Sequence, residues 1–440
     1  MGLLGRALGC AALALLVGGC GVTEWFEDEE ERLPGERISV LTLEQQIEAD
    51  PEVAEQRVAL PKPYRNESWG QPGGAPSHAM YHLSLPENPR EAWRADVGES
   101  SGDDQQILAQ PIVVSGRVYT MDATATVSAF SAEDGERLWR RDVSPEDDEG
   151  VFGGGLAYDQ GRLFVTTGYG TVVALDPSNG EEIWRQRVGA PMRAGPAARD
   201  GRVFAVTVIN QTVALSADDG RELWRHQGIE EQSGLLGSAT PAATDSAVIV
   251  AYSSGEILAL LNDNGRVLWN DSLAGITRTD PVADMADIRG MPVVDRGLVY
   301  AASNSGRMAA IDLRRGARAW EAEIGSVEMP WAGGAYVFAV TTDAQLVALT
   351  RERGRVRWVT QLPAYEDPED KTGPIVWQGP VLAGDRLILA GSNETAVTVS
   401  PYNGEVLGTI GLPDKPAVSP VVAKDTVYIL TDDATLLALR

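Results

Sequence analysis

The sequence predicts an all-β protein, an eight-bladed β-propeller built from four-stranded antiparallel blades. A strand-turn-strand-turn-strand unit recurs along residues 91–440, and most of the units end with a tryptophan. An unpaired strand around Trp93 opens this region, and the last unit, 425–440, stops before its tryptophan strand. We therefore expect the ring to close by pairing of the N-terminal strand with the C-terminal blade.

One unit, GRLFVTTGYGTVVALDPSNGEEIWR (161–185), shows how each part is built. Its apolar residues alternate or run together as they do in buried strands. Asp176 can accept a hydrogen bond from the backbone two residues on, and Gly180 can take a positive φ, so the two predict a tight turn. Trp184 follows on the last strand, where we interpret it as core that fills the space between blades. The other units are 116–140, 201–225, 246–270, 297–321, 335–359 and 385–409, and in the last of these Leu407 stands where we expect the tryptophan.

The charge of the chain excludes one class of partner. The 440 residues carry a net charge of −26, and the sequence pI is about 4.5. A field of that sign opposes binding to phosphate backbones, so we expect no nucleic-acid partner.

The N-terminus reads MGLLGRALGCAALALLVGGC, with a short apolar stretch that cannot span a bilayer. Its end, Val17-Gly18-Gly19-Cys20, resembles a bacterial lipobox. That resemblance implies a lipoprotein signal peptide over residues 1–19 and a lipid such as palmitate on Cys20. Gly21, where an Asp would favour retention in the inner membrane, then implies the cell outer membrane.

Three further segments follow the signal peptide. Residues 20–60 contain an acidic run and predict a mostly disordered tether. Residues 61–90 are an N-terminal extension that we expect to pack on the propeller. The propeller itself is expected over residues 91–440.

The repeat pattern V-Y/F…V-x-A-L-D-x-x-x-G-x-x-x-W resembles that of the pyrroloquinoline-quinone (PQQ) enzymes and their non-enzymatic relatives. With the lipobox, the eight units and RLPGERISVL (32–41), the chain resembles the alphaproteobacterial form of the BamB family, the propeller lipoproteins of the outer-membrane β-barrel assembly machinery. The resemblance implies a non-catalytic scaffold, a monomer within that complex, that faces the periplasm. It also implies docking on the periplasmic arm of BamA and a role in the folding and insertion of outer-membrane proteins.

Two alternatives belong to other classes of protein. A PQQ-dependent dehydrogenase resembles this chain in its repeat but usually carries a vicinal cysteine pair over the cofactor, whereas the two cysteines here are Cys10 and Cys20. A periplasmic ligand sensor would need a polar, aromatic-lined central funnel.

His78 and His82 have a spacing that suits two zinc ligands, but no third ligand is clustered with them. We therefore expect no catalytic residue, no cofactor and no metal.

Two loops between blades hold the candidate partner-binding residues. The loops are GIEEQSGLLGSATP (228–241) and LAGITRTDPVADMADIRGMP (273–292), and they combine apolar residues with charges. On residue types alone, these apolar side chains could equally tuck into the propeller face. The resemblance to the BamB family implies that the loops contact BamA, and the predicted contact residues are Leu235, Leu236, Asp284, Asp287 and Arg289.

Overall fold

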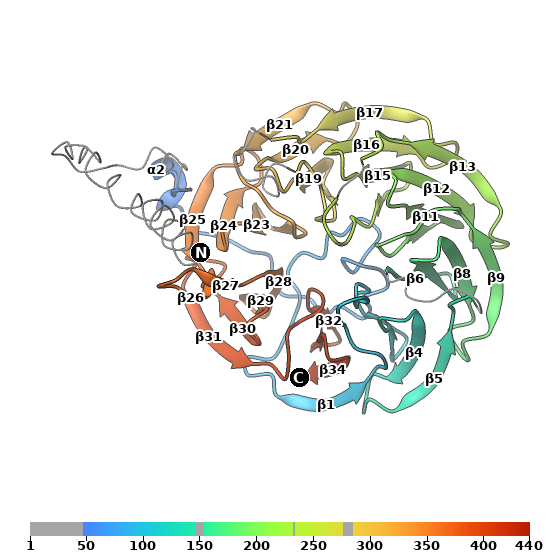
Figure 1. Cartoon of the computed structure of the whole chain (residues 1–440). Coiled ribbons are helices and arrows are strands. Elements are labelled where there is room, and N and C mark those ends of the chain that lie inside the picture. The colour runs from blue at the N-terminus through green and yellow to red at the C-terminus, as the bar shows by residue number, and fades with distance from the viewer. Residues whose placement is uncertain (1–46, 146–152, 232–233, 276–284) are drawn as a thin grey trace, which may run out of the picture. The chain divides into compact units, whose positions relative to one another are not determined.

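The computed structural model describes residues 47–145, 153–231, 234–275 and 285–440. Eight four-stranded antiparallel sheets, the blades, are arranged around a central axis, with the first strand of blades 1 to 7 at the hub and the fourth at the rim (Figure 1). The predicted eight-bladed propeller is therefore confirmed. No helix among the described residues is long and apolar enough to cross a bilayer.

Each blade is named by its order along the chain, and its strands are given from hub to rim. Blade 1 contains β2 (Ile112–Val114), β3 (Arg117–Met121), β4 (Thr126–Ser131) and β5 (Arg137–Asp142); blade 2 contains β6 (Gly154–Asp159), β7 (Arg162–Thr167), β8 (Thr171–Leu175) and β9 (Glu182–Arg187); blade 3 contains β10 (Ala197–Arg199), β11 (Arg202–Val206), β12 (Gln211–Ser216) and β13 (Glu222–Gln227); blade 4 contains β14 (Ala242–Ala243), β15 (Ala247–Ala251), β16 (Glu256–Leu261) and β17 (Val267–Ser272). Blade 5 contains β18 (Val293–Asp295), β19 (Leu298–Ala302), β20 (Met308–Asp312) and β21 (Arg318–Ala322); blade 6 contains β22 (Trp331–Gly333), β23 (Tyr336–Val340), β24 (Gln345–Thr350) and β25 (Val356–Gln361); blade 7 contains β28 (Trp377–Ala383), β29 (Arg386–Gly391), β30 (Thr395–Val399) and β31 (Val406–Gly411).

Blade 8 joins the two ends of the propeller region in one sheet. Its strands are β32 (Val421–Ala423), β33 (Thr426–Leu430), β34 (Thr435–Leu439) and, at the rim, β1 (Glu91–Asp96). β1 pairs antiparallel with β34, and Trp93 lies opposite Ala438. A separate two-stranded hairpin, β26 (Tyr365–Asp367) and β27 (Thr372–Pro374), lies in the chain between blades 6 and 7.

A tryptophan on the rim strand closes the boundary, here called the seam, between its blade and the next. Trp224 of blade 3 lies opposite Ala214 in the sheet, and its Nε1 donates a hydrogen bond to the Asn262 carbonyl of blade 4 at 2.7 Å. Its ring packs on Gly265, where an added Cβ would lie 2.5 Å from the indole. The same contacts, an indole donating to a carbonyl and covering a turn glycine of the next blade, recur at Trp93, Trp139, Trp184, Trp269, Trp320 and Trp358.

Blade 7 lacks this tryptophan, and the vacant position is Gly408, so our placement of it at Leu407 is wrong. In the sheet Gly408 lies opposite Thr398, as Trp224 lies opposite Ala214. Leu407 precedes that position by one residue and therefore points to the other face, where it is 55% exposed. The seam between blades 7 and 8 is thus the one that no rim tryptophan closes within the described propeller.

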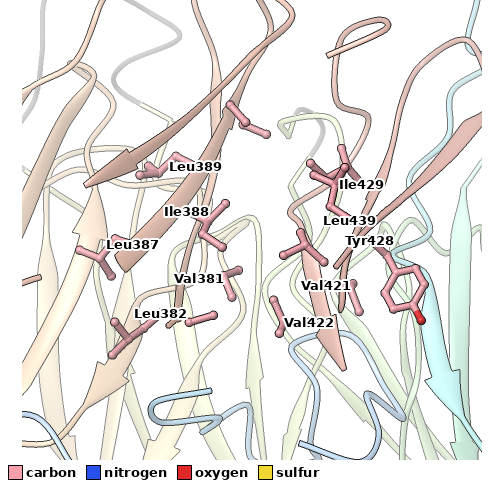
Figure 2. Close-up of a cluster of buried hydrophobic side chains, with 14 of the residues drawn as sticks. Val381, Leu382, Leu387, Ile388, Leu389, Val421, Val422, Tyr428, Ile429 and Leu439 are labelled. Atoms are coloured by element: carbon pink, nitrogen blue, oxygen red, sulfur yellow. The ribbon is translucent and has the colours of Figure 1, made fainter. Parts of the chain in front are cut away.

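Closer to the hub, aliphatic side chains fill the seam between blades 7 and 8. Figure 2 shows Val381 and Ile388 of blade 7 facing Val422 and Ile429 of blade 8. All four side chains are at most 5% exposed and belong to one buried cluster. Apolar burial therefore holds this seam from within.

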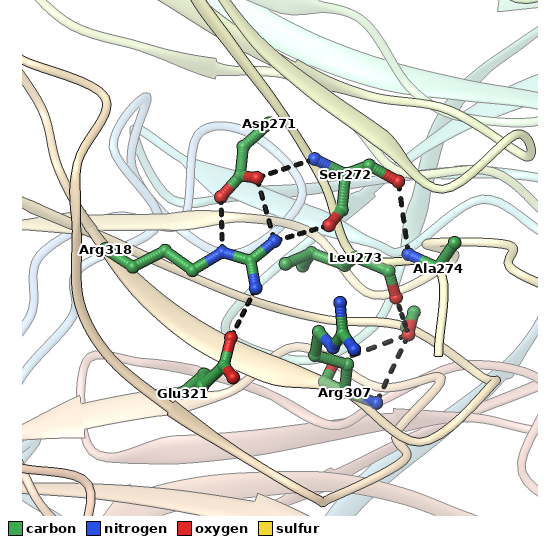
Figure 3. Close-up of polar contacts among 8 residues, drawn as sticks. Asp271, Ser272, Leu273, Ala274, Arg307, Arg318 and Glu321 are labelled. Atoms are coloured by element: carbon green, nitrogen blue, oxygen red, sulfur yellow. Dashed lines mark hydrogen bonds and ion pairs between the residues drawn. The ribbon is translucent and has the colours of Figure 1, made fainter. Parts of the chain in front are cut away.

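Polar contacts add to the seam between blades 4 and 5 (Figure 3). The Arg318 guanidinium of β21 donates to both carboxylate oxygens of Asp271 at 2.7 and 2.8 Å, and to the Ser272 carbonyl at 2.6 Å. This bidentate contact links the rim strands of neighbouring blades to each other.

The extension, residues 61–90, hydrogen-bonds to the innermost part of every blade. The backbones of Trp69 and Val113 exchange two hydrogen bonds of 2.7 Å, and the Gln71 amide bonds both backbone groups of Ala198. The remaining six blades are bonded at Tyr158, Ala243, Val294, Trp331, Leu382 and Lys424. One segment thus ties together eight strands that are far apart in sequence.

The residues just before the extension contact the rim of blade 6. A short helix, α2 (Pro51–Ala54), is capped by Asp50, whose carboxylate accepts the Glu52 N–H at 2.9 Å. The Asp50 N–H donates to the Val356 carbonyl at 2.8 Å, and Arg355 pairs with the carboxylates of Asp50 and Glu52. Within the segment that we predicted to be a tether, residues 50–54 therefore lie on β25.

Candidate functional site

The hub of the propeller holds a buried carboxylate beside a small cavity of about 110 Å³. Glu328 accepts hydrogen bonds from the Ser419 hydroxyl at 2.9 Å and the Gly379 N–H at 3.3 Å, and Arg289 lies 3.8 Å away. Burial raises the pKa of Glu328, while Arg289 and the two donors act in the opposite direction. These partners account for Glu328 as a satisfied buried acid.

The hub does not fit the quinone cofactor of the dehydrogenases that share this repeat. Sites for ligands of that size occupy about 300 Å³ or more, well above the 110 Å³ here. Pro72 of the extension itself lines the cavity. Within the described residues, no group of three or more His, Cys, Asp and Glu could hold a metal ion.

The two predicted loops meet beside the hub, and together they contribute to a groove of about 520 Å³. Leu235 is half-buried and Leu236 is 36% exposed, and both line the groove together with Arg289. The other wall consists of Val340 to Ala344 of blade 6, Ile375 and Val376 before blade 7, and Trp377 at the start of β28. The structure therefore places both leucines on an accessible, largely apolar surface, which we call the leucine groove.

Asp287 joins the two loops from the inside. Its side chain is 4% exposed, and its Oδ2 accepts the Leu235 N–H at 2.7 Å. Burial raises the pKa of Asp287, while the Leu235 N–H, Arg289 and Arg193 act in the opposite direction. The geometry makes Asp287 a residue that positions Leu235, with its carboxylate turned away from solvent.

The other predicted residues fall in two places, beside the hub and outside the described residues. Arg289 is half-buried and turns its guanidinium toward Glu328 at the hub. Ile288 of the same loop is 1% exposed, so its side chain is buried in the propeller. Residue types alone had left open whether the apolar side chains of this loop contact a partner or are buried. Cys20 and Asp284 lie outside the described residues.

Sequence reasoning missed the wall of the leucine groove that comes from the chain between blades 6 and 7. Tyr365 and Ile375 line the groove, and Val376 is 47% exposed there. The signal was present as an extra turn sequence, EDPEDKTGP (366–374), which forms the β26–β27 hairpin. An additional pair of strands between two repeats is typical of a functional insertion.

The two histidines of the extension serve the fold. His78 Nδ1 contacts the Pro292 carbonyl at 2.7 Å, whereas His82 Nδ1 contacts the Pro61 carbonyl and its Nε2 accepts the Asp385 N–H. Each ring thus bonds a different part of the chain. Their spacing in sequence reflects two separate structural contacts.

Comparisons with known sequences agree on one family. The family model described as outer membrane protein assembly factor BamB matches residues 84–149 and 123–360. The BamB of Salmonella typhimurium is 28% identical over 68% of this chain and 76% of its own length. The BamB of Alkalilimnicola ehrlichii is 30% identical over 36% of this chain, and the match spans 39% of that protein.

Solved structures share the fold at low sequence identity. BamB from Moraxella catarrhalis superposes with a TM-score of 0.69 and 19% identity, over 80% of this chain and 99% of that one. The quinohemoprotein alcohol dehydrogenase from Comamonas testosteroni has a TM-score of 0.64 and 14% identity, over 88% and 83% of the two chains. Both likenesses concern the propeller alone. The family model covers more than half of the residues, and the chain therefore belongs to the BamB family of outer membrane protein assembly factors.

Proposed function

We propose that this protein is a non-catalytic scaffold of the outer-membrane β-barrel assembly complex, and that it docks on the periplasmic arm of BamA. Lipid on Cys20 would hold it at the periplasmic face of the outer membrane. Membership of the BamB family supports this role, and the observation that carries the docking is the leucine groove. The docking surface consists of Leu235, Leu236 and the wall at Val376.

Three properties of the leucine groove suit a protein partner. Apolar side chains from separate loops are exposed together, with Leu236 at 36% and Val376 at 47%. Charged groups, Arg289 and Asp343, lie at the same groove. An apolar centre with a polar rim is the usual anatomy of a protein interface. Asp287 supports this surface indirectly, because it fixes the backbone of Leu235.

The test is co-purification of BamA with the tagged full-length protein from solubilised outer membranes. Leu236→Asp places a charge in the groove without disturbing the Asp287 contact, and we expect it to reduce the recovered BamA about tenfold or more. Ile229→Asp is the matched control, because Ile229 belongs to the same loop and is 59% exposed but does not line the groove. Equal recovery of BamA by the two variants would move the docking surface elsewhere.

A PQQ-dependent dehydrogenase is the second candidate, favoured by the shared propeller alone. The small hub cavity weighs against it. Titration of the purified protein with the quinone and Ca²⁺ tests it directly, and saturable binding with a quinone absorbance change would replace the scaffold proposal.

A further inference from the structure

The seam between blades 7 and 8 opens to solvent as a groove of about 990 Å³. Blade 7 lines it with Thr398 and with Leu407 to Ile410, and the chain leading into β1 lines it with Leu85 and with Glu87 to Arg90. Gly408 therefore lies at the groove, in the position that a tryptophan occupies in the other blades. We call it the seam groove.

The rim strand beside the seam groove is unlike the other seven. β31 reads VLGTIG and carries no charge, whereas each of the rim strands β1, β5, β9, β13, β17, β21 and β25 contains at least one charged residue. Val406 is 48% exposed, Leu407 55% and Ile410 39%. Charged side chains are a common way in which proteins protect an edge strand from pairing with another chain. β31 has an open edge without that protection, since it is the last strand of its sheet.

The other seven seams indicate what kind of side chain fits beside Gly408. At seven seams an indole fills this position and donates to a backbone carbonyl of the next blade. An added Cβ at Gly408 would meet only the Thr398 hydroxyl, at 3.8 Å, so the position has room. An aromatic side chain on a strand paired with β31 would lie across the glycine, an arrangement known to stabilise glycine positions in sheets.

The charges at the seam groove balance. Arg90 and Arg386 contribute two positive charges, and Glu87 and Asp385 contribute two negative charges. The Arg386 guanidinium donates to the backbone carbonyls of Gly384 and Glu87, which keeps it at the groove wall. A segment without net charge therefore suits the groove better than an acidic or basic one.

We propose that the seam groove binds an extended, uncharged segment of another polypeptide, which adds a strand to β31 and places an aromatic side chain over Gly408. Strand addition supplies affinity through backbone hydrogen bonds, and the aromatic position supplies selectivity. Strands of membrane β-barrels alternate apolar with polar residues and carry aromatic residues at the edges of their apolar band, so segments of that chemistry are the partner. This binding uses neither the leucine groove nor the hub.

The test uses the purified full-length protein and a fluorescein-labelled peptide of alternating threonine and valine with one central tryptophan. We expect saturable binding by fluorescence anisotropy, and about tenfold weaker binding of the same peptide with alanine in place of tryptophan. Absence of saturable binding, or equal binding of both peptides, would overturn the proposal.

Variants of the protein locate the binding. Gly408→Trp fills the position from within, and we expect it to abolish peptide binding while circular dichroism and the melting temperature show a folded propeller. Leu407→Lys adds a charge to the open edge and should weaken binding. Leu138→Lys is its matched control on β5, since Leu138 also precedes the tryptophan position by one residue and is 45% exposed.

The outcomes separate the two proposals. Equal loss of peptide binding in Leu407→Lys and Leu138→Lys would exclude the seam groove. Leu236→Asp should leave peptide binding unchanged, so failure of BamA docking and failure of strand addition are read from different variants.

Discussion

Seven seams of the propeller and the eighth are held in different ways. At the seven, a rim tryptophan crosses to the next blade and covers a glycine there. At the seam between blades 7 and 8, the rim is open and the contacts lie further inward, in the aliphatic cluster of Figure 2. The extension crosses the same seam, because Leu83 bonds to Leu382 of blade 7 and Asn66 bonds to Lys424 of blade 8. The difference shows that the ring has two independent means of closure, one at the rim and one at the hub.

The largest expected effect comes from removing a rim tryptophan. Trp224 is 8% exposed, and its ring packs at 5.8 Å from that of Phe204. Trp224→Ala leaves a cavity and an unpaired Asn262 carbonyl, so we expect a loss of about 3–5 kcal/mol in the free energy of unfolding. Urea denaturation monitored by circular dichroism measures it.

Leu407→Ala gives the matching measurement at the open seam. Because Leu407 is 55% exposed, its truncation should change stability by less than about 0.5 kcal/mol. A similar loss in both variants would mean that the eighth seam is closed at its rim in solution.

The second effect concerns closure at the hub and depends on pH. His78 is 2% exposed, its Nε2 has no hydrogen-bond partner, and burial lowers its pKa to about 4. Between pH 6.5 and 4 the unfolded chain therefore binds a proton at this residue that the folded chain does not. The free energy of unfolding should fall across that window, by roughly 3 kcal/mol from this residue alone.

The difference between the wild type and His78→Asn isolates that contribution. Asparagine suits the positive φ of 61° at this position and does not titrate. We expect urea midpoints of the variant to fall less steeply from pH 6.5 to 4 than those of the wild type. Parallel curves would show that His78 is not held neutral at the hub, and the hub would then be a weaker closure than the contacts suggest.

The rim could be predicted from the sequence, whereas the hub could not. The repeat places Gly180 and Trp184 at a fixed spacing, and the structure uses both positions as contacts between blades. The extension has no such period, since it bonds largely through backbone groups and single side chains such as Gln71. The position of Gly408 required the register of the sheet, because a shift of one residue turns a side chain to the other face.

The candidate site was also predicted only in part, because contacts between loops depend on the fold. The composition of the two loops marked Leu235 and Leu236, and both line an accessible groove. Composition does not distinguish an exposed acid from a buried one. The sequence therefore predicted a partner contact for Asp287 as it did for Leu235 and Leu236. The Leu235 N–H that Asp287 accepts lies 52 positions away in the chain, and only the fold brings the two together.

The third effect separates the two roles of glycine at a closed seam. Gly220 and Gly201 have nearly the same φ, 72° and 74°, but a Cβ on Gly220 would lie 2.6 Å from the Trp184 ring, whereas a Cβ on Gly201 would meet nothing within 4 Å. Both alanine variants incur the strain of a positive φ, and Gly220→Ala also displaces the indole. We expect Gly220→Ala to lose about 1–3 kcal/mol more than Gly201→Ala in urea denaturation. Equal losses would mean that the indole moves aside freely, and the closed seams would then resemble the open one more than their geometry indicates.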